Sequence, residues 1–209
     1  GQLAEFLRSQ LTAMKQGQLM NRIQVEKGYS VELVDPQAPI FDVATAGYPS
    51  KGNPDAKVTL VEFADYQCPH CKQASSVIKN LLERYGDQIQ VVFRDYPINP
   101  SGISRKVAEA AVCADQQGRF WEFHDLAFEK QSYLKAIKPD MLAQQLGLNM
   151  DQFNSCYAKD ETKTRVADSL EEWDRLGLTG TPTFFINGRQ LHVHGDLETG
   201  LVNAIEQAL

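Results

Sequence analysis

Hydrophobic and polar positions divide the chain into a strand–helix–strand unit, a long helical stretch and a closing hairpin. Residues 58–64 are short, nearly all apolar and rich in β-branched side chains, which is typical of a strand buried on both faces. Apolar residues at spacings of three and four from Cys71 to Tyr85 predict a helix. Residues 88–96 predict a second strand, so the order strand, helix, strand indicates a parallel βαβ unit.

The second half of the chain changes from helix back to strand. Helical stripes fill residues 102–177, and Thr183–Ile186 then has strand character. Asn187-Gly188 is a strong turn signal, so residues 191–193 are expected to return antiparallel. A last helix begins at about Asp196. The pattern predicts an α/β fold.

The first 50 residues read as a separate region, an N-terminal helix and linker. An apolar stripe predicts an amphipathic helix over residues 1–23, and a connection containing Pro and Gly follows, which puts a domain boundary near residue 50. The helix either packs on its own domain, binds a partner, or joins copies of the chain through residues 1–28. We favour a homo-oligomer because the connection separates this helix from the core pattern. A stripe of this width suits a dimer, and a trimer also stays open.

Composition limits the classes of protein. With 43% hydrophobic residues the chain can bury a core, and no run approaches the ~18 apolar residues of a spanning helix, so a soluble protein is expected. The net charge of −6 argues against nucleic acid or an anionic membrane as a partner. No basic-then-apolar leader is visible, so no signal peptide is expected within these residues.

The sequence Cys68-Pro69-His70-Cys71 lies where the first buried strand passes into a helix. A Cys-x-x-Cys pair at this junction is typical of a redox site. Cys68 is placed at the helix N-terminus, where backbone N–H groups favour a thiolate, and Pro69 suits the first helical position. Cys71 falls on the buried stripe. We therefore predict Cys68 as the attacking sulfur and Cys71 as the resolving one, with His70 either stabilising the thiolate or facing solvent.

Zinc is the competing interpretation of this pair. A structural zinc site would need a second close pair of ligands, whereas Cys113 and Cys156 stand alone on predicted helices. The sequence therefore predicts no metal and no other cofactor. Cys113 and Cys156 would form either a structural disulfide, which we favour, or two buried free thiols. His124, within an aromatic helix, is expected to be a packed histidine.

Two further features fit a redox site. Glu62 interrupts the apolar strand six residues before Cys68. It would either relay protons to the cysteines, with a pKa raised by desolvation, or reach solvent at the end of the sheet. Thr181-Pro182 precedes the hairpin strand, and a cis peptide bond is nearly confined to such X-Pro sites.

Three motifs, in order, resemble the DsbA-like thiol–disulfide oxidoreductases of bacteria: F-A-D-Y-Q-C-P-H-C-K at 63–72, F-W-E-F-H-D at 120–125 and G-T-P-T-F-F-I-N-G at 180–188. The resemblance implies a thioredoxin fold built from residues 51–101 and 178–209 and interrupted by a helical domain, 102–177. It also implies a periplasmic location, a cis Pro182 facing the Cys68–Cys71 pair, and Glu62 as the family's buried acid. The expected partners are unfolded or partly oxidised secreted proteins and a redox partner that regenerates the pair.

Two departures from the DsbA pattern leave the activity open. Many DsbA proteins carry Val before the cis proline, whereas Thr181 resembles disulfide isomerases such as DsbC. About 50 residues also precede the core, and dimeric isomerases have an N-terminal oligomerisation segment. We therefore expect an enzyme that introduces disulfides and possibly isomerises them, with Thr181 and Pro182 binding substrate. The alternatives are an oligomeric isomerase or reductase, and a redox-inactive thioredoxin-fold binding or chaperone module.

Overall fold

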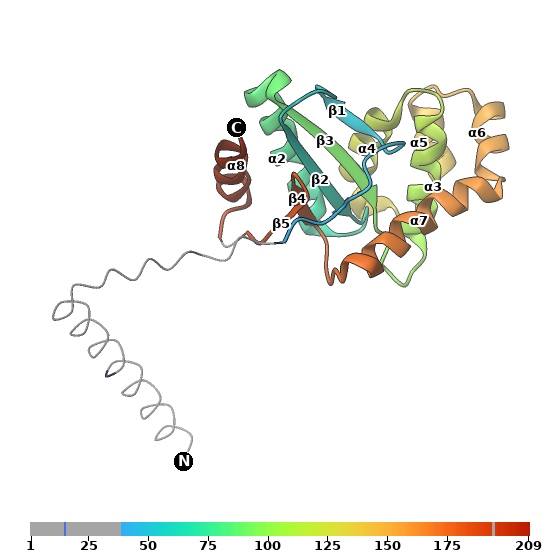
Figure 1. Ribbon diagram of the computed structural model, residues 1–209. Helices are drawn as coiled ribbons and strands as arrows, with labels where there is room; N and C mark the ends of the chain where they lie inside the picture. The colour runs from blue at the N-terminus through green and yellow to red at the C-terminus, as the bar shows by residue number, and fades with distance from the viewer. Residues whose placement is uncertain (1–14, 16–38, 194) are drawn as a thin grey trace, which may run out of the picture. The chain divides into compact units, whose positions relative to one another are not determined.

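The protein is described by a computed structural model that covers Lys15 and residues 39–193 and 195–209. The predicted helix over 1–23 and the oligomerisation segment 1–28 lie outside the described residues, apart from Lys15. The chain divides into two compact units, 1–37 and 38–209. All that follows concerns the second unit (Figure 1).

A five-stranded sheet in the order β1-β3-β2-β4-β5 forms the centre of this unit (Figure 1). The strands are β1 (Ser50–Gly52), β2 (Val58–Ala64), β3 (Ile89–Asp95), β4 (Thr183–Ile186) and β5 (Arg189–Leu191). The predicted βαβ unit is present, because β2 and β3 are parallel and are joined by α2 (Pro69–Tyr85). In their register Glu62 lies opposite Phe93, and Ala64 lies opposite Asp95.

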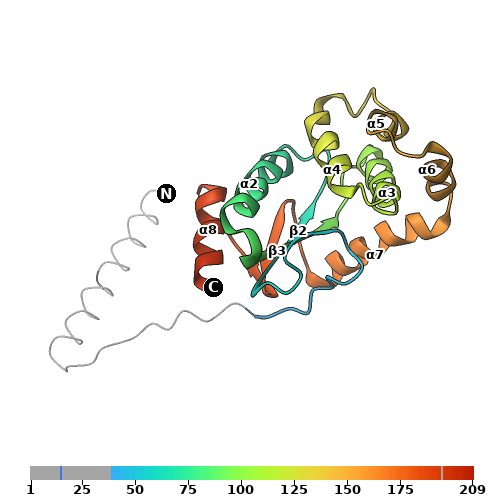
Figure 2. The ribbon, with the colours of Figure 1, turned by 90° about the horizontal axis from the view of Figure 1, so that it is seen from above.

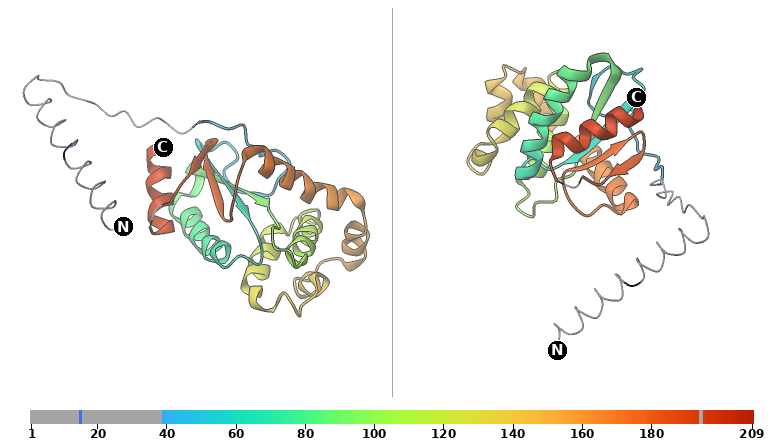
Figure 3. Two further views of the ribbon diagram at one scale, coloured as in Figure 1. Left: turned by 90° about the horizontal axis from the view of Figure 1, so that it is seen from below. Right: turned by 90° about the vertical axis from the view of Figure 1, so that its left-hand side faces the viewer.

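Helices cover both faces of the sheet. On one face α2 and α8 (Leu197–Ala208) lie side by side, and they are joined through Glu206, which accepts hydrogen bonds from Arg84 and Tyr85 (Figures 2 and 3). On the other face α7 (Asp160–Leu176) packs Trp173 and Leu176 against the sheet. The sheet is therefore the middle of three layers, which explains why β2 is apolar on both sides.

The helices between β3 and β4 form an inserted domain that shares a core with the sheet (Figure 2). They are α3 (Ile103–Asp115), α4 (Phe120–Glu129), α5 (Pro139–Gln145), α6 (Met150–Tyr157) and the long α7. Tyr66, Cys71 and Phe93 pack against α3 and α4 in this core. The expected α/β thioredoxin fold with a helical insertion is confirmed. Among the described residues, no helix has the length and apolar character needed to cross a membrane.

The segment before β2 belongs to the compact unit, which begins at Ala38 and not near residue 50. The ring of Phe41 packs edge-on against Phe185 at 5.9 Å, and its N–H donates to the carbonyl of Gly188. Residues 50–52, expected to be connection, form the short edge strand β1, which pairs antiparallel with β3. The strand after the Asn187-Gly188 turn ends at Leu191, earlier than predicted.

Arg94 connects the segment before β1, residues 39–49 (the leading segment), to the sheet and to α7. Its side chain is fully buried and makes an ion pair with Glu172 of α7 at 2.5 Å. The guanidinium also donates to the carbonyl of Ala44 at 2.6 Å and lies over the ring of Tyr48 at 3.6 Å. One buried cation therefore joins three segments that are distant in the sequence.

Candidate active site

A tight turn between β2 and α2 positions Cys68. The buried Asp65 forms this turn: its carbonyl accepts from the N–H of Cys68 at 3.0 Å, and its carboxylate accepts from the N–H of Gln67 at 2.6 Å. Cys68 has extended backbone angles and is the N-cap of α2, and Pro69 occupies the first turn. The Cys68 sulfur therefore lies where the helix leaves its first N–H groups unpaired.

The inserted domain holds the same turn from the other side. The amide of Gln131 donates to the carbonyls of Tyr66, at 3.0 Å, and Cys68, at 2.8 Å. Ser104 of α3 donates to the carboxylate of Asp65 at 2.5 Å. We did not predict Asp65 or Gln131 as site residues. Asp65 offered a signal, since Asp is a common turn residue, but Gln131 offered none in the sequence.

The two cysteines are free thiols with opposite acidities. The pKa of Cys68 is lowered to about 5, chiefly by a hydrogen bond from the Cys71 thiol and against the opposing effect of burial. Hydrogen bonds from the Thr181 side chain and from the N–H groups of Cys71 and His70 contribute to the same lowering. Burial raises the pKa of Cys71 well above its ordinary value. At neutral pH Cys68 is therefore a half-buried thiolate and Cys71 a protonated, buried thiol.

Glu62 lies inside the protein and does not reach solvent at the end of the sheet. Its side chain is 1% exposed, and burial raises its pKa to about 8, with the Cys68 charge as a second cause. Its charge in turn raises the pKa of Cys71. Oε1 has no hydrogen-bond partner among the described residues. A neutral carboxyl group close to the cysteine pair at pH 7 can give up or take a proton.

Thr181-Pro182 forms a cis peptide bond immediately before β4, the strand that pairs with β2, and this bond lies beside Cys68. The Cys68 thiol lies 3.4 Å from the carbonyl oxygen of Thr181, to which it donates when protonated. Beyond this contact lies a groove of about 450 Å³. Its walls are residues 179–184, residues 190–193 and Leu197. Thr181 belongs both to this groove and to the contact with Cys68.

The two residues between the cysteines are both exposed. Pro69 begins the helix, as expected. His70 contributes its backbone N–H to the Cys68 sulfur, and its imidazole is not among the groups that shift the pKa of Cys68. The role predicted for the His70 side chain therefore remains a prediction.

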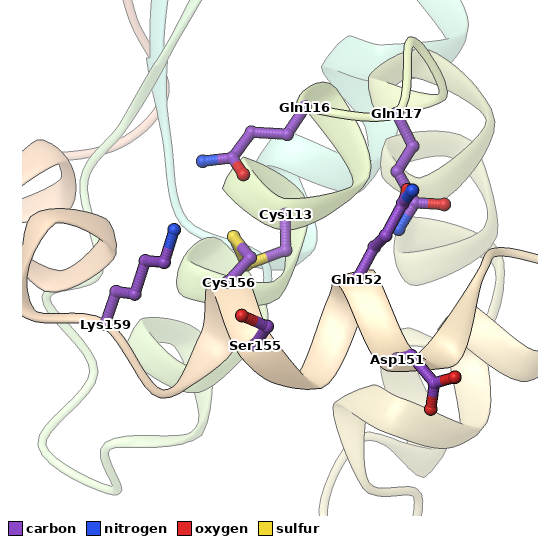
Figure 4. A pocket seen from close by; sticks show the side chains of 8 residues that line it. All are labelled: Cys113, Gln116, Gln117, Asp151, Gln152, Ser155, Cys156 and Lys159. Carbon is purple, nitrogen blue, oxygen red and sulfur yellow. A yellow bond between two sulfur atoms is a disulfide. The ribbon is translucent and has the colours of Figure 1, made fainter.

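Cys113 of α3 and Cys156 of α6 form a disulfide away from the active site. It lies at the floor of a polar pocket of about 430 Å³ (Figure 4). Gln116 and Lys159 lie on one side of the bond, and Gln117 and Gln152 on the other (Figure 4). The bond ties the first helix of the insertion to a later one.

No group of three or more His, Cys, Asp or Glu side chains in the described part of the chain is arranged to hold a metal ion. The chemistry that the site residues themselves offer is thiol–disulfide exchange, because a half-buried thiolate, a buried thiol and a neutral acid lie together. His124, expected to be packed, is buried among aromatic rings of α4 and the sheet.

Comparison with known proteins gives a consistent family. The sequence profile described as "Thioredoxin" matches residues 45–207. A curated relative, the Na(+)/H(+) antiporter NhaA 3 of Salinispora tropica, is 37% identical over 143 residues, which are 68% of this chain and 22% of that protein. The chain thus spans about a fifth of the length of this relative.

Two solved structures are similar along most of their length. The thioredoxin-like oxidoreductase from Silicibacter pomeroyi has 28% identity and a TM-score of 0.66, over 78% of this chain and 92% of that one. The thiol-disulfide exchange protein alpha-DsbA2 from Wolbachia pipientis has 25% identity and a TM-score of 0.68, over 78% and 88%. The chain belongs to the thioredoxin family, and its structural neighbours are DsbA-like thiol–disulfide oxidoreductases.

Proposed function

We propose that this chain is a protein disulfide oxidoreductase that passes a Cys68–Cys71 disulfide to substrate thiols. The observation that carries the proposal is the difference between the two thiols, because Cys68 is ionised near pH 7 and Cys71 is buried and protonated. A stabilised thiolate stabilises the reduced pair, which makes the disulfide oxidising.

The reaction follows from this arrangement. A substrate thiolate attacks Cys68 Sγ, a substrate–Cys68 disulfide forms, and the Cys68–Cys71 bond breaks. Its electron pair goes to Cys71, which takes a proton from Glu62. A second substrate thiolate then attacks the substrate sulfur, and Cys68 leaves as a thiolate. The substrate loses two electrons and the cysteine pair gains them.

The groove beside cis Pro182 suits an unfolded or partly oxidised protein as substrate. An extended segment would lie along residues 179–184, with Thr181 next to the attacked sulfur. A second redox partner must then reoxidise the pair. Such a cycle fits an oxidising compartment, so we place the protein in the periplasm, where disulfides persist.

Replacing Cys71 tests the proposal directly. In a Cys71→Ala variant the resolving thiol is absent, so we expect mixed disulfides between Cys68 and substrate cysteines to accumulate. Mass spectrometry under non-reducing conditions would detect them. A Cys68→Ala variant, which keeps Cys71, is the matched control and should trap none. If Cys71→Ala captures no substrate, the chain is a redox-inactive binding module.

Isomerisation is the second candidate activity, because Thr181 precedes the cis proline and residues 1–28 are predicted to associate. Recovery of a substrate with scrambled disulfides, by the full chain and by a chain lacking residues 1–28, would measure it. Sedimentation of both chains would show whether the segment makes a dimer. Equal recovery by both would mean that isomerisation does not need residues 1–28, and no recovery by the full chain would limit the activity to oxidation.

A further inference from the structure

Behind the active site lies a group of buried polar side chains, of which the proposed reaction uses only Glu62. Tyr66 is 1% exposed and His124 is 3% exposed. Tyr66 Oη and His124 Nε2 have no hydrogen-bond partner among the described residues, and the same holds for Oε1 of Glu62. Buried polar atoms are normally paired with protein or with internal water, so three on one side of a sheet need an explanation.

These three side chains share one place in the fold. Glu62 lies opposite Phe93 in the β2–β3 register, so both side chains are on the same face of the sheet. The rings of Tyr66 and His124 both pack on Phe93, at 5.8 and 4.9 Å between centroids. The Tyr66 and His124 rings are 6.1 Å apart. The hydroxyl and the imidazole therefore flank the ring next to the buried acid.

His124 connects this buried group to the surface. Its Nδ1 lies 2.8 Å from Oδ1 of Asp125, a carboxylate whose side chain is 61% exposed. A carboxylate can only accept, so Nδ1 carries the proton and Nε2 presents its lone pair to the interior. An imidazole in this arrangement can take a proton at one nitrogen and release it from the other.

A groove brings solvent to Asp125. It lies between α2 and α4, has a volume of about 320 Å³ and is lined by Lys72, Ser75, Ser76, Lys79, Asp125, Phe128 and Glu129. Among these residues Phe128 also packs on both His124, at 4.9 Å, and Tyr66, at 5.0 Å between ring centroids. The Phe128 ring therefore lies between the groove and the buried side chains of Tyr66 and His124.

We infer that Asp125, His124 and Tyr66 form a proton path that joins this groove to the carboxyl group of Glu62. The inference rests on the proposed function. When the Cys68–Cys71 bond is reduced, Glu62 gives its proton to Cys71 and is left as a buried carboxylate. A proton from solvent then reaches Asp125, which donates it to Nδ1 of His124 while the ring is in its Nε2–H tautomer. Nε2 releases its own proton through Tyr66 Oη and internal water to Glu62, which leaves His124 in the Nδ1–H form that pairs with the Asp125 carboxylate.

The charges around the path support this direction. The hydrogen bond to His124 is the largest cause that lowers the pKa of Asp125, and burial lowers that of His124 itself. Asp125 therefore favours its carboxylate form, and His124 favours its neutral form with a single N–H. The titratable and charged groups that face the path are Lys51 of β1, Glu62 of β2, Asp95 of β3, the thiols of Cys68 and Cys71, and Lys72, Lys79 and Glu129 at the groove.

Asp125→Asn is the first test, because this exposed residue can be changed without opening the core. The oxidised full-length protein is reduced with dithiothreitol, quenched with acid at short times and alkylated, and the rate is followed from pH 5 to 9. We expect reduction to slow by about tenfold at pH 9, where Glu62, whose pKa is about 8, starts ionised and must first be protonated through the path. The solvent deuterium isotope effect should rise as well. The matched control is Glu129→Gln, which removes the same charge from the same groove and should behave as wild type.

His124→Phe is the second test, since a ring of similar size fills the aromatic site without a nitrogen. It should show the same slow reduction and the same isotope effect. The absorbance of the Cys68 thiolate at 240 nm should titrate as in wild type for both variants, which a general structural defect would not preserve. If His124→Phe does not fold, Asp125→Asn alone decides.

Two negative results have different meanings. Wild-type rates and wild-type isotope effects in Asp125→Asn would overturn the proton path and leave the proposed function intact. A wild-type protein whose Cys68–Cys71 pair does not exchange with dithiothreitol would contradict the proposed function itself.

Discussion

The difference in pKa between Cys68 and Cys71 arises because the two residues are three positions apart at the start of one helix. Cys68 caps α2 and is half-buried, so helix N–H groups and Thr181 can stabilise its negative charge. Cys71 is one turn further on and has no exposed surface. The same helix therefore supplies an anion site at its first residue and an apolar site one turn later.

The acidity of Cys68 predicts how stability depends on pH. Its pKa is about 5 in the folded protein and 9.0 ordinarily, so between these values the unfolded chain binds more protons. The free energy of unfolding of the reduced protein should therefore rise relative to the oxidised protein from pH 5 to 8, and this gain should be lost as pH falls through 5. Urea unfolding of both forms at several pH values measures it. A difference that does not change with pH would show that Cys68 has ordinary acidity in the folded state.

Single residues were predictable from the sequence where their position relative to the Cys-x-x-Cys pair identified them. Cys68, Cys71 and Glu62 have fixed offsets along one strand and one helix, so secondary structure alone brings them together. Gln131 and Tyr66 depend on how the insertion packs on the sheet. Local periodicity contains no information about that contact, because residues 66 and 131 belong to different elements that meet only in the folded protein.

At the scale of elements, the bond between α3 and α6 closes a long loop within the insertion. The two cysteines are 43 residues apart. In the chain-entropy model a loop of this length stabilises the fold by about 4 kcal/mol. α3 also carries Ser104, which contacts the active-site turn through Asp65. The bond therefore secures a helix that supports the site.

A variant without the active-site thiols isolates the contribution of this bond. In Cys68→Ala/Cys71→Ala, Cys113 and Cys156 are the remaining cysteines of four. We expect dithiothreitol to lower the free energy of unfolding of this variant by about 4 kcal/mol in urea titrations. The control is the same titration after alkylation without reduction. An effect below about 1 kcal/mol would mean that the denatured chain is not constrained by the bond.

Long, strongly periodic elements were predicted correctly, and so was the short strand β4 (Thr183–Ile186), whereas the short edge strand β1 was not. β2, α2 and β3 have apolar patterns set by burial on both sides of a layer. β1 has three residues, all exposed, and exists because the edge of β3 offers unpaired backbone groups. This strand forms because its backbone pairs with the edge of β3, and its own sequence, Ser-Lys-Gly, does not favour a strand.

At the scale of the whole molecule, Arg94 and Glu172 connect the sheet, the insertion and the leading segment. Both side chains are buried, and Glu172 also accepts from the N–H of Ala44 at 2.8 Å. Breaking a buried pair leaves an uncompensated charge, which typically costs about 3–5 kcal/mol. The pair was not predictable from sequence, since its members are far apart along the chain.

Replacing Glu172 alone, and then Arg94 and Glu172 together, distinguishes the effect of the buried charge on stability from the effect of packing. We expect Glu172→Ala to lower the free energy of unfolding by about 3 kcal/mol or more, because Arg94 stays buried without its partner. Arg94→Met/Glu172→Leu should lose much less. Urea unfolding of the two variants makes the comparison. Equal losses would assign the effect to volume and not to charge.

The strand order also determines when the surroundings of Cys68 are completed during synthesis. Thr181, cis Pro182 and β4 leave the ribosome more than a hundred residues after Cys68 and Cys71, and β4 then pairs directly with β2. Until that pairing forms, the carbonyl of Thr181 cannot lie next to the Cys68 sulfur. A nascent chain therefore carries its two sulfurs without the segment that faces them, and they stay uncovered until β4 has joined the sheet.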